Sequence, residues 1–273
     1  MGTDTGALGR SYKGRTDSMM VVTINPKTKK TTITSIPRDL GVTIPGYESK
    51  SPSKINAAYA FGQAGTAIRT VQAVFNIPID FYVLVNMGGM EKVVDEAGGV
   101  DITPTLSFTY QGYTFTKGVK THMDGKKALA YSRMRYDDPQ NDYGRQTRQR
   151  AVLTAIISKS SSISTLLNKD FIDSISNETQ TDFKFDDLVD LAKNYRSATG
   201  NIEETHAQGS GQTVNGQSME IVSKTELQRV TDFIRSGLSL SQEETGSAAL
   251  SANSTSTNTS DSSVEQANIN AGN

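Results

Sequence analysis

The sequence predicts a layered α/β domain, and three observations indicate this fold class. Short β-rich runs alternate with longer segments whose apolar residues recur at helical spacing. The alternation is mixed, and no segment repeats at a fixed period along the chain. The chain of 273 residues is also long enough for one large domain. Together these features favour a sheet covered by helices over an all-helical or all-β fold.

The first expected elements are a β-hairpin and a long helix. Residues 19–25, MMVVTIN, and residues 30–36, KTTITSI, are β-rich and are joined by PKTK, which is typical of a hairpin. Residues 56–75 have an apolar stripe at helical spacing. The stripe consists of Ala58, Phe61, Gly65, Ile68, Val71 and Phe75.

The remaining elements continue the alternation. Later strand-like runs lie at residues 81–85, 99–104, 106–115 and 128–136, with two more within 206–222. Later helix-like runs lie at residues 89–99, 144–159, 183–197 and 225–238. Glycines close the first of these helices, and two aspartates begin the third, as helix ends prefer.

The last part of the chain has a different composition. Residues 241–273 contain no lysine, arginine or aromatic residue and are rich in Ser, Thr and Asn. Such a segment cannot bury enough apolar surface to offset the entropy lost on ordering. We therefore expect one folded domain over residues 1–240 and a disordered tail over residues 241–273.

Composition limits the possible functions. With 28 Lys and Arg against 29 Asp and Glu, the formal net charge is −1, so any anion site must be local. The absence of cysteine excludes disulfides, thiol nucleophiles and cysteine-bound metals. No signal peptide and no apolar run of bilayer length is visible. Because candidate functional residues begin almost at Met1, we expect the chain to be a fragment of a longer protein.

An arginine-rich segment is the strongest local signal. Residues 128–150 contain five arginines, and Arg133 and Arg135, two apart in a predicted strand, would share one face. On the following helix Arg145, Arg148 and Gln149 lie at i, i+3 and i+4 and would also share a face. Guanidinium groups and helix N-termini both bind phosphate oxygens. This convergence predicts a site for a diphosphate or a larger anion.

The same helix continues its basic first turn as an apolar stripe through Val152 and Ile156. That layout is expected for a ligand with an anionic head and an apolar tail. Packing of the stripe on the sheet is the alternative, and the helix on its own favours packing.

The hairpin brings together a second group of charges. If the turn is centred near Lys27, Asp17 lies opposite Pro37 and therefore beside Arg38 at one edge of the sheet. Asp4, in the glycine-rich segment before the hairpin, is a possible second carboxylate. Carboxylate oxygens suit Mg²⁺, which also binds substrate phosphates. An ordinary surface ion pair between Asp17 and Arg38 is an equally good interpretation from spacing alone.

Six motifs, taken together, resemble the LytR-CpsA-Psr family and are most similar to its capsular-polysaccharide branch. They are GTDTGALGR, GRTDSMMV, SIPRD, KINAAYAFG, EAGGVDI and ALAYSRMRY…NDYGRQTRQ, in this order. The resemblance is dense over residues 1–160 and looser up to about residue 240. It implies an α/β/α domain whose central mixed sheet has helices on both sides and a hydrophobic tunnel for a polyprenyl chain.

The resemblance also implies an activity. Family members are membrane-anchored phosphotransferases on the extracellular face of the cell membrane, and the anchor would be missing from this chain. They transfer a glycopolymer, here expected to be capsular polysaccharide, from a polyprenyl diphosphate to peptidoglycan through a phosphodiester. Mg²⁺ is the implied cofactor, and no nucleic acid partner is expected.

Site residues follow from the matching motif positions. Asp4 and Asp17 are the implied Mg²⁺ ligands. The implied diphosphate-binding residues are Arg15, Arg38, Arg133, Arg135, Arg145, Arg148 and Gln149. Asp142, in the family's D-x-G-R element, is the candidate for positioning or deprotonating the acceptor hydroxyl, and it forms the expected catalytic set with Arg38, Arg133 and Arg135. The residues expected to line the lipid tunnel are Phe61, Ile68, Val152 and Ile156.

Three other functions stay open at this point. A nucleic-acid-binding transcriptional regulator would use the arginines on backbone phosphates, but Asp137, Asp138 and Asp142 lie among them, and no helix-turn-helix or RNP pattern is present. A hydrolase would cleave the same polyprenyl diphosphate with water as acceptor. A non-catalytic lipid carrier would not need Asp4 or Asp17.

Overall fold

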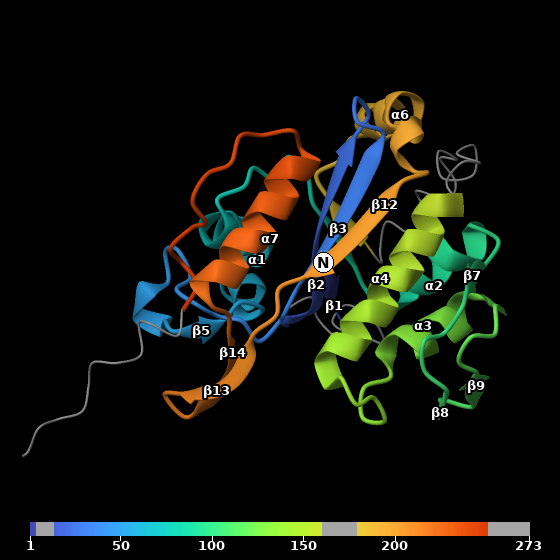
Figure 1. The fold of residues 1–273 in the computed structure, drawn as a ribbon, viewed down its shortest axis with the longest axis horizontal. Coiled ribbons are helices and arrows are strands. Elements are labelled where there is room, and N and C mark those ends of the chain that lie inside the picture. The colour runs from blue at the N-terminus through green and yellow to red at the C-terminus, as the bar shows by residue number, and fades with distance from the viewer. Residues whose placement is uncertain (4–13, 160–178, 251–273) are drawn as a thin grey trace, which may run out of the picture.

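A mixed six-stranded sheet forms the centre of the molecule, as the sequence predicts (Figure 1). The structure, a computed structural model, describes residues 1–3, 14–159 and 179–250. Across the sheet the strands follow the order β11 (Thr179–Thr181), β6 (Val83–Val85), β1 (Gly2–Thr3), β2 (Thr16–Asn25), β3 (Lys30–Ile36) and β12 (Ile202–His206). β1 pairs with β6, and β3 with β12, in parallel, whereas the other pairings are antiparallel.

Helices cover both sides of this sheet (Figure 1). α1 (Ala57–Phe75) and α7 (Lys224–Gly237) lie on one side. α2 (Met87–Glu96), α3 (Gly125–Arg133) and α4 (Asn141–Lys159) lie on the other. α6 (Phe185–Asn194) lies near the turn between β2 and β3. The three-layer arrangement confirms the predicted fold class.

Short elements complete the described part of the chain. β7 (Val100–Ile102) pairs with β10 (Thr121–Met123), and β8 (Phe108–Tyr110) pairs with β9 (Tyr113–Phe115). β4 (Gly41–Val42) pairs with β5 (Ser53–Lys54), and β13 (Ser210–Val214) with β14 (Gln217–Ile221). Two 3₁₀ helices lie in connections: η1 (Glu48–Lys50) between β4 and β5, and η3 (Arg196–Ala198) between α6 and β12. No described helix has the length and apolar character needed to cross a bilayer.

The apolar interior consists of two separate clusters. The larger joins the central sheet to α1 and α7 and includes Met19, Ile36, Val71 and Ile234. The smaller is built from α2, α3, α4 and β7–β10 and includes no residue of the central sheet. The helical layer that contains α4 is therefore not sealed onto the sheet by a continuous apolar core, which leaves space between the two.

The predicted strand at residues 128–136 is wrong, because most of this segment is the helix α3. The Asp124 side chain accepts a hydrogen bond from the backbone N–H of Lys127 at 2.8 Å and caps the helix N-terminus. Residues 128–132 are all buried, so the segment shows no helical alternation of apolar and polar residues. Arg133 is the last residue of the helix and Arg135 lies in the following loop, so they do not share a strand face.

The long helix α1 is kinked, which changes the direction of one predicted tunnel residue. Gly62 and Gln63 have non-helical backbone angles, with Gln63 at φ 58°. Because of the kink, Phe61 and Ile68 no longer follow one helical repeat and do not lie on one face of α1. Phe61 contacts Tyr47, with ring centroids 5.4 Å apart, and its carbonyl accepts a 2.8 Å hydrogen bond from the Tyr47 hydroxyl.

Residues 241–250 pack against the domain, so the predicted start of a disordered tail at residue 241 is wrong. The carbonyl of Ser241 accepts a 2.7 Å hydrogen bond from Arg235, and Leu250 N donates to the carbonyl of Gly41 at 2.9 Å. The carbonyl of Glu243 accepts from Gln228, and its carboxylate pairs with Arg235. These hydrogen bonds act together with Ala248 and Ala249, which pack against the larger apolar cluster. Residues 251–273 lie outside the described residues.

Removal of residues 241–250 is expected to destabilise the domain. Truncation after Leu240 removes the Ser241 and Glu243 partners of Arg235, which is 6 % exposed, and the Thr245 partner of the buried Thr231. A loss of several hydrogen bonds at about 1 kcal/mol each lowers Tm by about 10 °C for a domain of this size. Thermal unfolding of the chains ending at Leu240 and at Leu250 isolates the effect of these ten residues. Equal Tm values for the two chains would contradict the packing described above.

Candidate functional site

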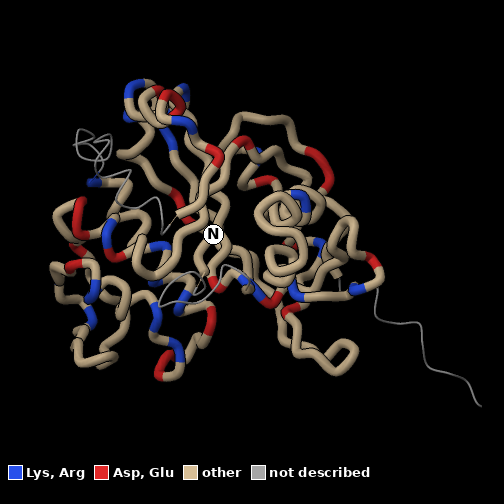
Figure 2. The backbone as a smooth tube through the Cα atoms, turned by 180° about the vertical axis from the view of Figure 1, so that it is seen from behind, with Lys and Arg blue, Asp and Glu red and all other residues tan. Residues whose placement is uncertain are grey.

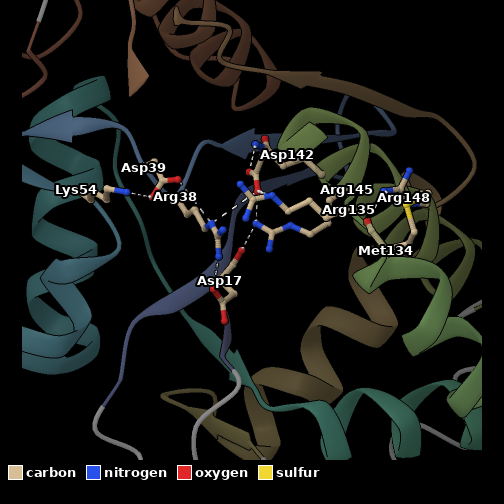
Figure 3. Close-up of polar contacts among 10 residues, drawn as sticks. Asp17, Arg38, Asp39, Lys54, Met134, Arg135, Asp142, Arg145 and Arg148 are labelled. Carbon is tan, nitrogen blue, oxygen red and sulfur yellow. Dashed lines mark hydrogen bonds and ion pairs between the residues drawn. The ribbon is translucent and has the colours of Figure 1, made fainter. Parts of the chain in front are cut away.

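The antiparallel pairing of β2 with β3 brings Asp17 and Arg38 together. Met19 pairs with Ile36, so the register continues to Asp17 opposite Arg38, one residue beyond the predicted Pro37. Arg38 Nη1 donates to Asp17 Oδ1 at 2.5 Å. The guanidinium Nε of Arg38 also lies 3.9 Å from Asp39, whose carboxylate pairs with Lys54 at 2.9 Å (Figure 3). The predicted contact between Asp17 and Arg38 is confirmed.

The first turns of α4 bring Asp142 and Arg145 to the same place. Arg145 Nη2 lies 2.7 Å from Asp142 Oδ1 and donates to the backbone carbonyl of Asp17 at 3.1 Å. The Nε atoms of Arg38 and Arg135 lie 3.7 and 3.8 Å from the same Asp142 oxygen (Figure 3). Three guanidinium groups from three separate segments therefore surround one carboxylate.

Burial and charge act together on these arginines. Burial lowers the pKa of Arg38, but the carboxylates of Asp142, Asp17 and Asp39 outweigh it, so the net shift is upward. Burial lowers the pKa of Arg145, and Asp142 only partly opposes the shift. Both groups stay cationic at neutral pH, because the pKa of an arginine side chain lies far above 7.

Several donors of this cluster are left without a hydrogen-bond acceptor among the described residues. The buried Nε atoms of Arg38 and Arg145 have none. Buried donors normally have a partner, so open ones deserve an explanation. Arg38 Nε lies 3.7 Å from Asp142 Oδ1, which likewise has no hydrogen-bond partner among the described residues, so this pair is held together by charge and not by a hydrogen bond.

A cavity of about 1740 Å³ begins at this cluster. Arg38, Arg133, Arg135, Arg145 and Gln149 all line it, together with Asp17. The cavity follows β2 as far as Lys27, a distance of roughly 30 Å at the rise of an extended strand. A charged end therefore continues into a long, partly open cavity.

The wall of the cavity beyond the arginines is largely apolar. Val22, in a central strand of the sheet, is 39 % exposed because its side chain faces this space. Three of the four predicted tunnel residues, Ile68, Val152 and Ile156, line the cavity, and Phe61 does not. Other apolar lining residues are Met20, Met90, Val93, Leu153, Leu188 and Leu191.

Arg148 does not join the arginine cluster. Its side chain is 3 % exposed and turns toward Asp138 and the backbone carbonyl of Met134 (Figure 3). It lies four residues before Val152 yet lines no part of the large cavity. Sequence spacing placed Arg148 and Arg145 on one face, but three helical positions differ by about 60° in direction, enough to send the two side chains to different sides of the loop.

The remaining predicted residues divide into two cases. Arg15 is exposed and is not among the residues that line the cavity. Asp4 lies outside the described residues. Among the described residues no group of three or more His, Asp or Glu side chains could hold a metal ion, and Asp17 is the one predicted metal ligand that the structure places at the cavity.

Two participants were not predicted from the sequence. Gln146 donates from Nε2 to Asp142 Oδ2 at 3.1 Å, so both carboxylate oxygens of Asp142 have polar contacts. Lys54 neutralises Asp39 beside Arg38. Gln146 lies at i+4 from Asp142, a spacing that could have indicated the contact, whereas Lys54 enters from β5 with no local signal.

Chemically, the arrangement is an anion-binding group of arginines with a carboxylate at its centre and an apolar cavity behind it. The arginines can stabilise negative charge on phosphate oxygens. Asp142 can accept a proton or orient a hydroxyl group, provided that the bound group approaches within hydrogen-bond distance.

Comparison with known proteins gives a consistent result. The sequence matches the LytR_cpsA_psr family over residues 1–236. It is 43 % identical over 239 residues to the polyisoprenyl-teichoic acid–peptidoglycan teichoic acid transferase TagU of Enterococcus faecalis, covering 87 % of this chain and 78 % of that protein.

Solved structures share the fold. Protein gbs0355 of Streptococcus agalactiae superposes with a TM-score of 0.81 at 32 % identity, covering 93 % of this chain and 91 % of that chain. A protein of Enterococcus faecalis described as a transcriptional regulator, EF0465, has a TM-score of 0.78 at 36 % identity, covering 89 % and 87 % of the two chains. Because the family match spans residues 1–236, which is most of the sequence, the chain belongs to the LytR-CpsA-Psr family.

Proposed function

We propose that the protein is a phosphotransferase that attaches a glycopolymer, carried on a polyprenyl diphosphate, to peptidoglycan. The observation that supports this most directly is the arginine cluster at one end of a long apolar cavity. The diphosphate would bind Arg38, Arg133, Arg135 and Arg145, and the polyprenyl chain would occupy the cavity. Burial of the chain is favourable by about 25 cal/mol per Å² of apolar surface.

In the reaction, an oxygen of a peptidoglycan hydroxyl attacks the phosphorus that carries the glycopolymer. A phosphodiester bond to peptidoglycan forms. The P–O bond between this phosphorus and the bridging oxygen of the diphosphate breaks, and polyprenyl phosphate leaves with that oxygen. The arginines stabilise the charge on the phosphoryl oxygens in the transition state. Asp142 orients the hydroxyl or accepts its proton. The enzyme would act at the extracellular face of the cell membrane, where lipid-linked donor and peptidoglycan meet.

Mg²⁺ remains a proposal, with Asp17 and Asp4 as its ligands. Asp17 fits this role in part because its side chain is 38 % exposed and lines the cavity beside the arginines. When bound, the ion would neutralise charge on the diphosphate and the departing lipid phosphate. The protein's own residues would orient the diphosphate and keep water from the apolar end.

Two donor polymers are candidates. The motifs of the sequence favour capsular polysaccharide, whereas the name of the Enterococcus faecalis relative refers to teichoic acid. Purified lipid-linked forms of both polymers, offered to the protein in the same transfer assay, discriminate between them.

The alternatives have weaker support. A relative in the solved structures is described as a transcriptional regulator. In this chain, however, acidic residues lie among the basic ones and would repel a polyanion (Figure 2). Hydrolysis would use the same site with water as acceptor and is detected as polymer release without transfer. A lipid carrier would bind the donor and release it unchanged.

Loss of a central guanidinium is expected to abolish transfer. Arg145→Ala removes the 2.7 Å partner of Asp142 and one group that would hold the diphosphate. We expect transfer to peptidoglycan to fall by about 10²- to 10³-fold, comparable to loss of one oxyanion donor. Arg229→Ala is the control, because Arg229 pairs with Glu226 and does not line the cavity. Unchanged transfer by a folded Arg145→Ala variant would remove Arg145 from the site.

Asp142→Asn separates binding from chemistry. The amide has nearly the same shape but cannot accept the hydroxyl proton, so turnover should fall by about 10²- to 10⁴-fold. Donor affinity should change far less than turnover, because the loss of one negative charge near the diphosphate offsets part of the loss of the carboxylate that gathers the arginines. Isothermal titration with the donor and a transfer assay give the two quantities separately. A large loss of affinity with normal turnover would exclude the proposed role of Asp142.

Removal of divalent cations tests the metal proposal. Treatment with EDTA should stop transfer, and added Mg²⁺ should restore it. Asp17→Asn should raise the Mg²⁺ concentration needed for half-maximal rate, because a neutral amide is a poorer ligand for a hard cation. Full activity in excess EDTA would show that the reaction needs no metal.

A further inference from the structure

The ion pair between Arg148 and Asp138 is buried and lies outside the proposed mechanism. The two side chains are 3 % and 6 % exposed. Arg148 Nη1 donates to the Asp138 carboxylate, and its guanidinium lies 5.4 Å from the Phe108 ring centroid. A buried pair of this kind is weak evidence for stability, because desolvation offsets much of the attraction. Its contacts therefore point to another purpose.

The second contact of Arg148 is with the backbone between two site arginines. Arg148 Nη2 donates to the carbonyl oxygen of Met134, and the Met134 sulfur lies 3.9 Å from the same nitrogen. α3 ends at Arg133, and the carbonyls at a helix C-terminus lack intrahelical partners. Arg148 provides the donor that this carbonyl would otherwise lack. The neighbours of Met134, Arg133 and Arg135, both line the cavity.

Asp138 stabilises the other end of the same loop, which runs from residue 134 to residue 140. Its Oδ1 accepts a 2.8 Å hydrogen bond from the backbone N–H of Gln140, and its carbonyl accepts from Asn141 N at 2.9 Å. Gly144 allows the close approach of this loop to α4, since a Cβ there would lie 1.8 Å from Asp138 Oδ2. The loop from residue 134 to residue 140 is thus held to α4 at both ends.

We propose that Arg148 is a positioning residue, which holds this loop so that Arg133 and Arg135 reach the bound diphosphate. It does not touch the diphosphate itself. The inference rests on the proposed function for its ligand, but the contacts that carry it are independent of that function.

Arg150 supplies a matched control on the same helix. It too is a buried arginine of α4, but it donates to Ser35 Oγ at 2.8 Å and pairs with Glu204 at 3.3 Å, and it does not contact the loop. We compare Arg148→Met with Arg150→Met, using geranylgeranyl diphosphate as the probe in isothermal titration. Arg148→Met should weaken probe binding by about 10- to 100-fold, the loss expected when one charge-assisted hydrogen bond to the diphosphate is lost. Arg150→Met should stay within about twofold of the wild type, even if it lowers Tm as much.

A double-mutant cycle distinguishes positioning from direct contact. In the Arg133→Ala/Arg135→Ala background, Arg148→Met should cause no further loss of probe affinity. A loss as large as in the wild-type background would overturn the proposal, because Arg148 would then act without the two arginines.

Amide hydrogen exchange supplies a readout that does not depend on the ligand. Exchange at residues 134–140 should accelerate in Arg148→Met and stay near wild type in Arg150→Met. If wild type binds no prenyl diphosphate, the proposed function fails while this comparison still decides the role of Arg148.

Gly144→Ala, which displaces Asp138 without removing a charge, replaces Arg148→Met if that variant does not fold. Unchanged exchange in a folded variant would overturn the proposal.

Discussion

The site depends on the carboxylate of Asp142, which lies within 4 Å of three guanidinium groups. Arg38, Arg135 and Arg145 come from three different segments and would repel one another in a partly buried position without it. Asp142 itself lies in the first turn of α4, where the helix dipole favours a negative charge. The carboxylate therefore lets cationic groups gather before any ligand arrives. All three arginines line the cavity, where a phosphate could take over part of the role of the carboxylate.

The cavity exists because the layer containing α4 is attached to the sheet by polar contacts and not by a shared apolar core. Arg145 of α4 donates to the backbone carbonyl of Asp17 in β2, and Thr154 of α4 donates to the carboxylate of Glu204 in β12. Protein interiors normally pack without large voids, so an apolar space beside a central strand requires walls that cannot close. The separate core around α3 supports α4 from behind. These contacts join α4 to the sheet without filling the cavity, which Met20 and Val22 of β2 line together with Val152 and Ile156 of α4.

Patterns local to one hairpin or one helix turn predicted much of this site. The pairing of Asp17 with Arg38 needed only the hairpin, and a one-residue error in its register did not matter for long side chains. Arg145, Gln149, Val152 and Ile156 followed from the helical period. The errors arose where tertiary packing decides the structure. Residues 128–132 of α3 are all buried and show no periodicity, and the kink at Gly62 rotates Phe61 away. Arg148 was misplaced because its partners, Met134 and Asp138, belong to a loop whose path no pattern encodes. Residues 241–250 were misjudged because composition does not reveal that backbone hydrogen bonds can hold a polar segment in place.

Charge balance gives a final constraint on how the site would work. Arg38, Arg133, Arg135 and Arg145 line the cavity together with Asp17, and Asp142 lies among them, while Asp39 is neutralised by Lys54. Four guanidinium groups and two carboxylates leave about two positive charges, which matches the two negative charges of a diphosphate diester. The described residues alone therefore suit the diphosphate without a metal ion. An Mg²⁺ ion held by Asp17 would instead bring two further positive charges, so it would bind more tightly with the diphosphate than alone. By linkage, the diphosphate would likewise bind more tightly with Mg²⁺, and the two would enter the site as coupled ligands.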